Sequence, residues 1–149
     1  MGVRFNATPS VPTGFYRITT DEAASYVEFC PPSSFGALSV ERGYRDRARF
    51  GCPDGGEPVL KRVIAKPGEL VEISARGISI NGSLLPNTTA QSLDSLGRPL
   101  TAWPFGRYRV TVDTVWVAST FNARSFDSRY FGPIRTADIK HRLRPLWTE

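Results

Sequence analysis

Alternating apolar and polar residues predict short β-strands along much of the chain. The runs "LKRVIA" (60–65) and "LVEISA" (70–75) are rich in β-forming residues and are separated by "KPGE". The runs "GISI" (77–80) and "SLLP" (83–86) flank Asn81-Gly82, a pair that favours tight turns because both residues tolerate positive φ. We therefore predict two successive hairpins.

A further strand is predicted in "YRVTVDTVWVAS" (108–119), where apolar residues alternate from Val110 to Val117. Helix signals occur only in "TTDEAASYVEF" (19–29), with Thr20 or Asp21 as a cap, and in "TADIKHR" (136–142). The predicted fold class is therefore mostly β, with antiparallel sheets and one or two short helices.

The length of the chain, 149 residues, favours a single domain spanning 1–149. The stretch 83–106 begins polar and is then punctuated by glycine and proline, so we expect a short insertion there and no second domain. No run of about 18 apolar residues occurs, which predicts that this chain contains no membrane span.

Basic side chains give the chain a net charge of +5, and four arginines crowd into "ERGYRDRARF" (41–50). Such a cluster favours contact with anionic partners, either nucleic acid or acidic lipid. Because no nucleic-acid recognition motif accompanies the charges, we interpret the segment as a solvated loop and expect no nucleic-acid partner.

The chain has two cysteines, Cys30 and Cys52, each directly before a proline, and one histidine, His141. None of them has the close Cys or His companions that a zinc site requires, so no metal site is predicted. The cysteines are either a disulfide in an oxidising compartment or two thiols in the cytosol, and we favour the disulfide.

Two residues are candidates for nucleophilic chemistry. Ser10 lies in "TPSVPTGFY" (8–16), where Pro9, Pro12 and Gly14 restrict the backbone around it. Lys61 has apolar neighbours on a predicted strand, and burial of a lysine lowers its pKa and leaves a neutral amine available as a base. The pattern alone is also compatible with an ordinary loop serine, and for Lys61 it favours a strand lysine that faces water.

Four segments, "SVPTGFY", "LKRVIAKPGE", "INGSLLP" and "SFDSRYFGPI", follow the order and approximate spacing of the type I signal peptidases, the Ser/Lys serine peptidases of family S26. The resemblance extends from Ser10 to Trp147. The chain looks most similar to the TraF-like branch, the periplasmic peptidases that mature the pilin of conjugative transfer systems. A short spacer after Asn-Gly, the two cysteines and the box "STFNARSFDSRYFGPI" carry that similarity. It implies a partly closed barrel of antiparallel sheets.

Carried over to this chain, the resemblance implies that Ser10 is the nucleophile and Lys61 its general base. Ser125 matches the serine that orients the lysine amine. The backbone N–H of Ser10 and the hydroxyl of Thr8 match the donors of the oxyanion hole.

The same resemblance gives Asp127 two interpretations, a third catalytic residue or a structural brace. We favour the brace, because a carboxylate near Lys61 stabilises the charged amine and opposes its use as a base. Arg62 and Arg129 are expected to support the site structurally.

The implied activity is cleavage of a pilin precursor or another secreted precursor, without metal or cofactor. Hydrolysis and cyclising transpeptidation both fit. The alternatives are a general leader peptidase that cleaves after Ala-x-Ala, and a non-catalytic basic β module that binds nucleic acid or acidic lipid.

The resemblance also implies a location at the periplasmic side of the inner membrane, with an N-terminal anchor, absent from this chain, just before Met1. Phe5, Val11, Phe15 and Tyr16 suit either a lipid-facing surface or the core of the first strand. For Phe15 and Tyr16 we predict the core.

Overall fold

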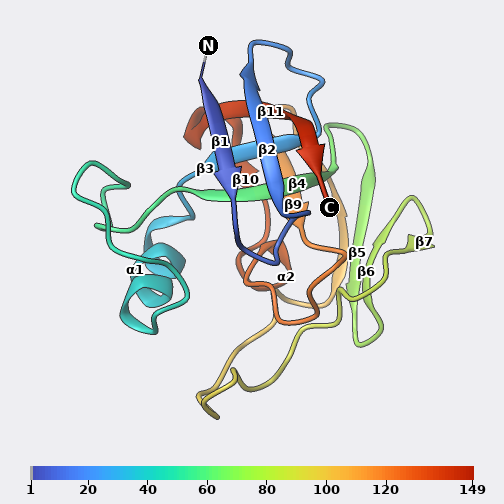
Figure 1. Ribbon diagram of the computed structural model, residues 1–149. Helices are drawn as coiled ribbons and strands as arrows, with labels where there is room; N and C mark the ends of the chain where they lie inside the picture. The colour runs from blue at the N-terminus through green and yellow to red at the C-terminus, as the bar shows by residue number, and fades with distance from the viewer. Residues whose placement is uncertain (1) are drawn as a thin grey trace.

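Two antiparallel sheets form most of the protein (Figure 1). The computed structural model describes residues 2–149, so the expected anchor ahead of Met1 lies outside the described residues. The larger sheet has seven strands in the order β1-β2-β11-β3-β4-β9-β10. Their bounds are β1 Val3–Asn6, β2 Gly14–Thr19, β3 Tyr26–Phe29, β4 Val59–Ala65, β9 Thr114–Ala118, β10 Ile134–Arg135 and β11 Ile139–Thr148. The predicted mostly β, antiparallel class is confirmed.

The smaller sheet has the order β7-β6-β5-β8, and helices are few and short. The strands are β5 Leu70–Ser74, β6 Gly77–Ile80, β7 Ser83–Leu84 and β8 Gly106–Arg109. The helices are α1 Ser33–Glu41, α2 Ser128–Phe131 and the 3-10 turn η1 Thr136–Asp138. None of the helices in residues 2–149 has the length and hydrophobicity needed to cross a bilayer.

Strand β9 is buried on both faces and joins the cores of the two sheets. Val115 and Val117 pack with Val27 and Phe131 in one apolar cluster. Trp116 and Ala118 point the other way, as the two-residue period of a strand requires, and pack with the apolar side chains of the smaller sheet. Strand β9 belongs to the larger sheet, and its two faces contact both apolar clusters, so it fixes the two sheets relative to each other.

Strand β11 pairs along its first half with β3 and along its second half with β2. Strand β11 therefore joins the β1–β2 pair to β3 and the rest of the larger sheet, as the blue and red arrows of Figure 1 show. The loop from Ala7 to Thr13 lies at the end of this pair and reaches Lys61 in β4. The long pairing of β11 thus brings the first segment of the chain to the middle of the sheet.

The turn "KPGE" forms but does not close the predicted hairpin. Glu69 N–H donates to Lys66 O, and Gly68 has the positive φ expected of a turn. However, β4 pairs with β3 and β9, while β5 pairs with β6 and β8, so the two strands belong to different sheets. The second predicted hairpin, around Asn81-Gly82, is present as β6–β7.

The predicted strand 108–119 is two strands, β8 and β9, with a turn between them. Val110, Val112, Val115 and Val117 do not keep a period of two, because three positions separate Val112 from Val115. Thr114 N–H donates to Thr111 O at this point, and Val112 is 78% exposed. The phase change in the apolar pattern therefore marks a turn that our prediction missed.

The prediction of a helix at 19–29 was wrong, because these residues form no helix. Asp21 instead caps a turn, accepting from the N–H of Ala23, and residues 26–29 form the central strand β3. The apolar and aromatic residues there pair with strands on both sides, which outweighs a weak helical signal. Of 136–142, only η1 is helical.

Helix α1 was not predicted. It follows Pro31-Pro32 and contains Gly36, where a Cβ would clash with the Asp54 carboxylate. Packing against a distant loop, and not a local capping signal, stabilises this helix.

Candidate active site

The loop that carries Ser10 is organised by the side chain of Asn6. Asn6 Nδ2 donates to the carbonyls of Thr8, Val11 and Pro12 at 2.8, 3.2 and 3.4 Å, and Asn6 Oδ1 accepts from the N–H and hydroxyl of Thr8. Asn6 is 6% exposed, so these bonds are shielded from water. One side chain therefore braces both flanks of Ser10.

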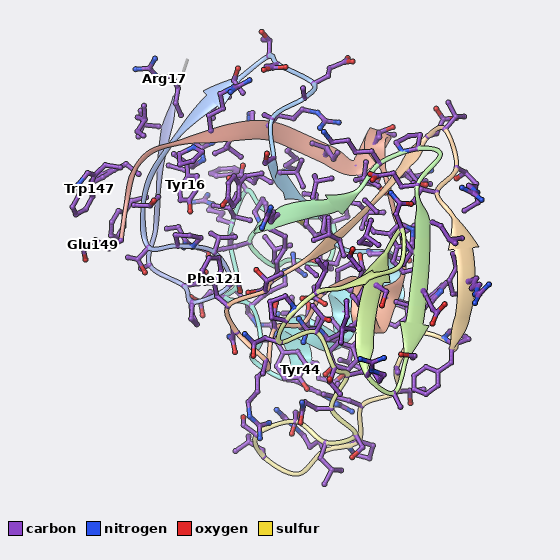
Figure 2. All side chains as sticks on the ribbon, turned by 90° about the vertical axis from the view of Figure 1, so that its right-hand side faces the viewer. Tyr16, Arg17, Tyr44, Phe121, Trp147 and Glu149 are labelled. Carbon is purple, nitrogen blue, oxygen red and sulfur yellow. A yellow bond between two sulfur atoms is a disulfide. The ribbon has the colours of Figure 1, made fainter. Side chains whose placement is uncertain are left out.

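Tyr16 on β2 supports the same loop from the protein interior. Its ring is fully buried, and its hydroxyl donates to Pro12 O at 2.6 Å. Burial raises the pKa of Tyr16 to about 12, so this donor remains protonated at neutral pH. Figure 2 shows Tyr16 inside the protein, whereas Trp147 of the neighbouring strand β11 projects from its edge.

Lys61 on β4 contacts two serine hydroxyls that come from opposite ends of the sequence. Its Nζ lies 2.7 Å from Ser10 Oγ and 2.8 Å from Ser125 Oγ. Lys61 is 5% exposed and faces the same side of β4 as the core residue Val63. The strand period thus directs the amine inward, to the point where the two serines converge.

Burial is the largest influence on the Lys61 amine and lowers its pKa from 10.5 to about 8. The negative charge of Asp127 opposes this shift, and the positive charge of Arg129 adds to it. A substantial fraction of Lys61 is therefore neutral near physiological pH, with a lone pair available to accept a proton.

Asp127 and Arg129 form a buried ion pair that holds the segment carrying Ser125. The Asp127 carboxylate accepts from Arg129 Nε at 2.8 Å, from Arg129 Nη2 at 2.9 Å and from Ser119 N–H at 3.0 Å. Arg129 also donates to the carbonyls of Asn87, Ala123 and Ser119. Within residues 2–149, Asp127 makes no hydrogen bond to Lys61, so its contacts are those of a brace.

Thr8 and Arg62 make no hydrogen bond to Ser10, Lys61 or Ser125 within residues 2–149. The Thr8 hydroxyl donates its one proton to Asn6 Oδ1 at 2.7 Å, so it is not free to donate elsewhere in this arrangement. Arg62 is exposed and points to the face of β4 opposite Lys61. The backbone N–H of Ser10, by contrast, has no acceptor among residues 2–149.

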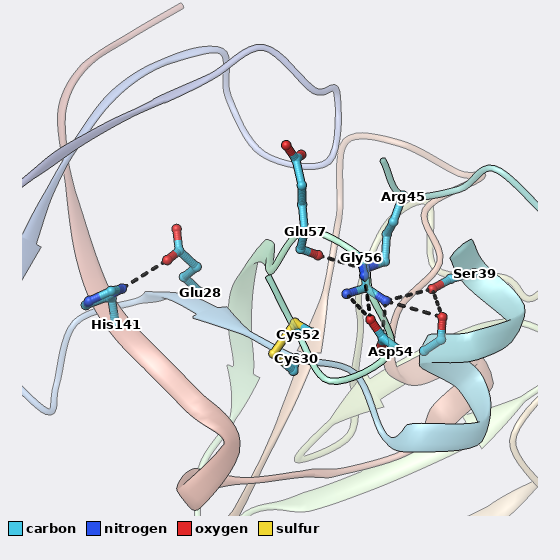
Figure 3. The surroundings of a disulfide bond; sticks show 10 residues. Glu28, Cys30, Ser39, Arg45, Cys52, Asp54, Gly56, Glu57 and His141 are labelled. Carbon is cyan, nitrogen blue, oxygen red and sulfur yellow. Dashed lines mark hydrogen bonds and ion pairs between the residues drawn. A yellow bond between two sulfur atoms is a disulfide. The ribbon is translucent and has the colours of Figure 1, made fainter. Parts of the chain in front are cut away.

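Cys30 and Cys52 form a disulfide, with an S–S distance of 2.07 Å (Figure 3). The neighbouring Arg45 is buried and donates to Asp54 at 2.9 and 3.1 Å and to Glu57 O at 2.8 Å. Together the covalent bond and the ion pair fix α1 and the loop 43–58 to the end of β3. The favoured pairing of the cysteines is thus present.

A cleft of about 1030 Å³ opens beside the Ser10–Lys61–Ser125 cluster. Its walls come from the Ser10 loop, the disulfide loop and the segment 91–100, and the cluster itself lines it. The described residues include no group of three or more His, Cys, Asp or Glu side chains placed to hold a metal ion. The site therefore offers a buried amine, two hydroxyls and room for an extended polypeptide.

The sequence motifs predict Ser10, Lys61, Ser125, Asp127 and Arg129 in this region, but they do not predict the role of Asn6. An asparagine followed two residues later by a polar residue in a Pro-rich segment is a recognised turn signal, because its side chain bonds the backbone nearby. That signal was present in "NATPS". The prediction that Tyr16 is in the core is correct, whereas Phe15 is 44% exposed and that prediction was wrong.

The chain is similar to known proteins over nearly its whole length. The family described as signal peptidase, peptidase S26, matches residues 4–147. A plasmid transfer protein TraF of Escherichia coli is 36% identical over 99% of this chain and 83% of its own length. A conjugal transfer protein TraF of Agrobacterium fabrum is 37% identical over the same shares.

A signal peptidase I of Enterococcus faecalis V583 has a solved structure that covers 86% of this chain and 100% of its own, with a TM-score of 0.46 and 23% identity. The family match spans nearly the whole chain, and the TraF relatives exceed 30% identity over almost its full length. The family implies a serine peptidase, and the chain belongs to the signal peptidase family S26.

Proposed function

We propose that this protein is a Ser/Lys endopeptidase in which Lys61 is the general base for Ser10. The observation that carries the proposal is the 2.7 Å contact between Lys61 Nζ and Ser10 Oγ, made by a lysine whose pKa burial lowers to about 8. A base close to neutral pH and within hydrogen-bond reach of a hydroxyl meets both requirements of nucleophile activation.

In this mechanism neutral Lys61 removes the Ser10 proton as Ser10 Oγ attacks the peptide carbonyl. The unpartnered N–H of Ser10 stabilises the resulting oxyanion, and the Thr8 hydroxyl joins it only by leaving Asn6. Lys61 then protonates the leaving amine, and an acyl-enzyme remains on Ser10. Water or a second amine resolves this ester. Ser125 holds Nζ in line by its 2.8 Å contact.

The proposed substrate is the pilin precursor of a conjugative transfer system. The support is the chain's similarity to plasmid and conjugal transfer proteins and the cleft of about 1030 Å³ beside Ser10. Hydrolysis gives a linear product, whereas attack by the substrate's own N-terminus gives a cyclic one.

We further propose that the protein works at the periplasmic face of the inner membrane. Phe5, Phe15 and Trp147 lie in register across β1, β2 and β11 and are 59%, 44% and 58% exposed. A row of exposed aromatic side chains close to the Ser10 loop suits contact with the lipid boundary, where aromatic residues are favoured. The disulfide fits an oxidising compartment.

The test is incubation of a pilin precursor with the wild-type protein, Ser10→Ala and Lys61→Ala, followed by mass spectrometry. Lys66→Ala, which changes an exposed lysine at the turn after β4, is the matched control. Cleavage by wild type and Lys66→Ala, with none by the other two, supports the dyad. Equal cleavage by all four would refute it. A cyclic product is lighter than the linear one by one water.

A further inference from the structure

Two loops that carry no part of the Ser10–Lys61–Ser125 cluster are tied together over the cleft. Tyr44 hydroxyl donates to Asp94 Oδ2 at 2.6 Å, and Arg42 Nη1 donates to Pro99 O at 2.7 Å. In return Arg98 Nη2 donates to Arg42 O at 3.0 Å. The segment 91–100 is therefore fixed against the end of α1 and the start of the disulfide loop, although it has no helix or strand of its own.

Three aromatic rings line the cleft below this contact. The ring centroids of Tyr44 and Phe126 are 5.2 Å apart. Phe126 stacks on Tyr130, with 5.4 Å between ring centroids and an interplanar angle of 16°. Leu93 and Leu100, from the segment 91–100, line the same cleft. We call Tyr44, Phe126, Tyr130, Leu93 and Leu100 the aromatic wall.

Both hydroxyl groups of the wall already bond to the protein. Tyr44 bonds Asp94, and Tyr130 hydroxyl accepts the N–H of Gln91 at 2.8 Å. The remaining bonds of Asp94 go to the N–H groups of Leu96 and Arg98 and to Arg98 Nε. What the wall offers to a ligand is therefore mainly apolar ring and leucine surface.

The wall is continuous with the reacting atoms. Phe126 directly follows Ser125, whose Oγ is 2.8 Å from Lys61 Nζ, and both serines line the same cleft. An extended peptide advances about 3.3 Å per residue, so the residues within a few positions of the cleaved bond are the ones that can lie along this cleft. A polypeptide bound at Ser10 is thus the occupant that the cleft itself indicates.

We propose that the aromatic wall is a subsite for one large apolar side chain of the substrate, leucine- or phenylalanine-like, a few residues from the scissile bond. The proposal rests on the proposed peptidase function and adds a specificity determinant to it. Leu93, which is 50% exposed, is the residue of the wall that substitution alters with least risk to folding.

The test uses quenched fluorescent peptides that share an Ala-x-Ala segment. They carry Ala, Leu, Phe or Asp at one position at a time, up to four residues on either side of the bond. We expect one position at which Leu or Phe raises kcat/KM about tenfold over Ala, and at which Asp lowers it. Leu93→Asp should remove that preference. Leu96→Asp, in the same loop but outside the cleft and 75% exposed, should retain it.

Binding of the same peptides to Ser10→Ala, followed by fluorescence anisotropy, separates this proposal from the catalytic one. A Leu or Phe preference in Kd that Leu93→Asp removes supports the wall even if no peptide is cleaved. Cleavage that Ser10→Ala abolishes, with no preference at any position, overturns the wall but leaves the dyad intact. Equal behaviour of Leu93→Asp and Leu96→Asp overturns it as well.

Discussion

Lys61 is the residue in which function and stability conflict most directly. Burial disfavours its charged form, so the folded protein binds a proton at this site less tightly than the unfolded chain, with a pKa of about 8 against 10.5. Between these values the unfolded state holds more protons, and stability contributed by this site therefore rises with pH. Well below pH 8 both states are protonated, and the full cost of the buried charge remains.

Replacing this lysine by methionine should therefore stabilise the protein at pH 7 while abolishing cleavage, because a side chain of similar length replaces a buried charge. We expect a gain of about 1 to 3 kcal/mol in the free energy of unfolding at pH 7. The difference from wild type should shrink by about 2 kcal/mol at pH 9.5. Urea unfolding at the two pH values measures it, and a difference independent of pH would contradict the shift in pKa.

Asn6 shows how one polar side chain shapes the loop that carries the proposed nucleophile, Ser10. Asn6→Ala removes five hydrogen bonds to the loop and should lower kcat by more than about tenfold with a smaller change in KM, because a displacement of about 1 Å at the reacting atoms is costly. Thr8→Val removes only the hydroxyl bond and should cost less than tenfold. A larger loss for Thr8→Val than for Asn6→Ala would instead assign Thr8 to the oxyanion hole.

At the level of elements, the Asp127–Arg129 ion pair holds the segment from β9 through α2 in its folded conformation. Asp127→Asn keeps the shape of the side chain but leaves a buried guanidinium without its counter-charge, which costs about 3 to 5 kcal/mol. We expect a large fall in thermal stability, with cleavage retained by the fraction that stays folded. A variant as stable as wild type but inactive would show that Asp127 takes part in catalysis.

Local pattern predicted many elements but not which strands pair. The runs before and after "KPGE" were recognised as strands, yet β4 and β5 entered different sheets because each already has two other neighbours. Residues 26–29 carried a helical signal that the central position of β3 overrides. Pairing partners depend on contacts distant in sequence, which a periodic pattern does not contain.

The candidate site was more accessible to sequence reasoning than the fold. Several motifs in a known order point to Ser10, Lys61 and Ser125, and the structure places Lys61 Nζ 2.7 Å from Ser10 Oγ and 2.8 Å from Ser125 Oγ. The contacts made by Asn6 and the aromatic wall depend on how loops fold over one another. No spacing in the sequence indicates that Tyr44 and Asp94, fifty residues apart, share a hydrogen bond.

At the scale of the whole molecule, the disulfide loop is attached to the catalytic core without containing any of its reacting groups. Replacing both Cys30 and Cys52 by alanine should lower the free energy of unfolding by about 3 kcal/mol, as expected for closure of a loop of this length. Because the loop lines the cleft, KM should rise while kcat changes little. Denaturant unfolding and steady-state kinetics measure both effects. A fall in kcat with KM unchanged would contradict this division between core and loop.

The central claim is that burial lowers the pKa of Lys61 to about 8 in the folded protein, so that part of the amine is neutral near physiological pH. It is tested most directly by NMR titration of the protein labelled with ¹³C at the lysine Cε atoms. The chain has three lysines, and the signal that Lys61→Met lacks identifies Lys61. We predict that the Lys61 signal titrates near pH 8. Titration of Lys61 near the ordinary value of 10.5 would contradict the account.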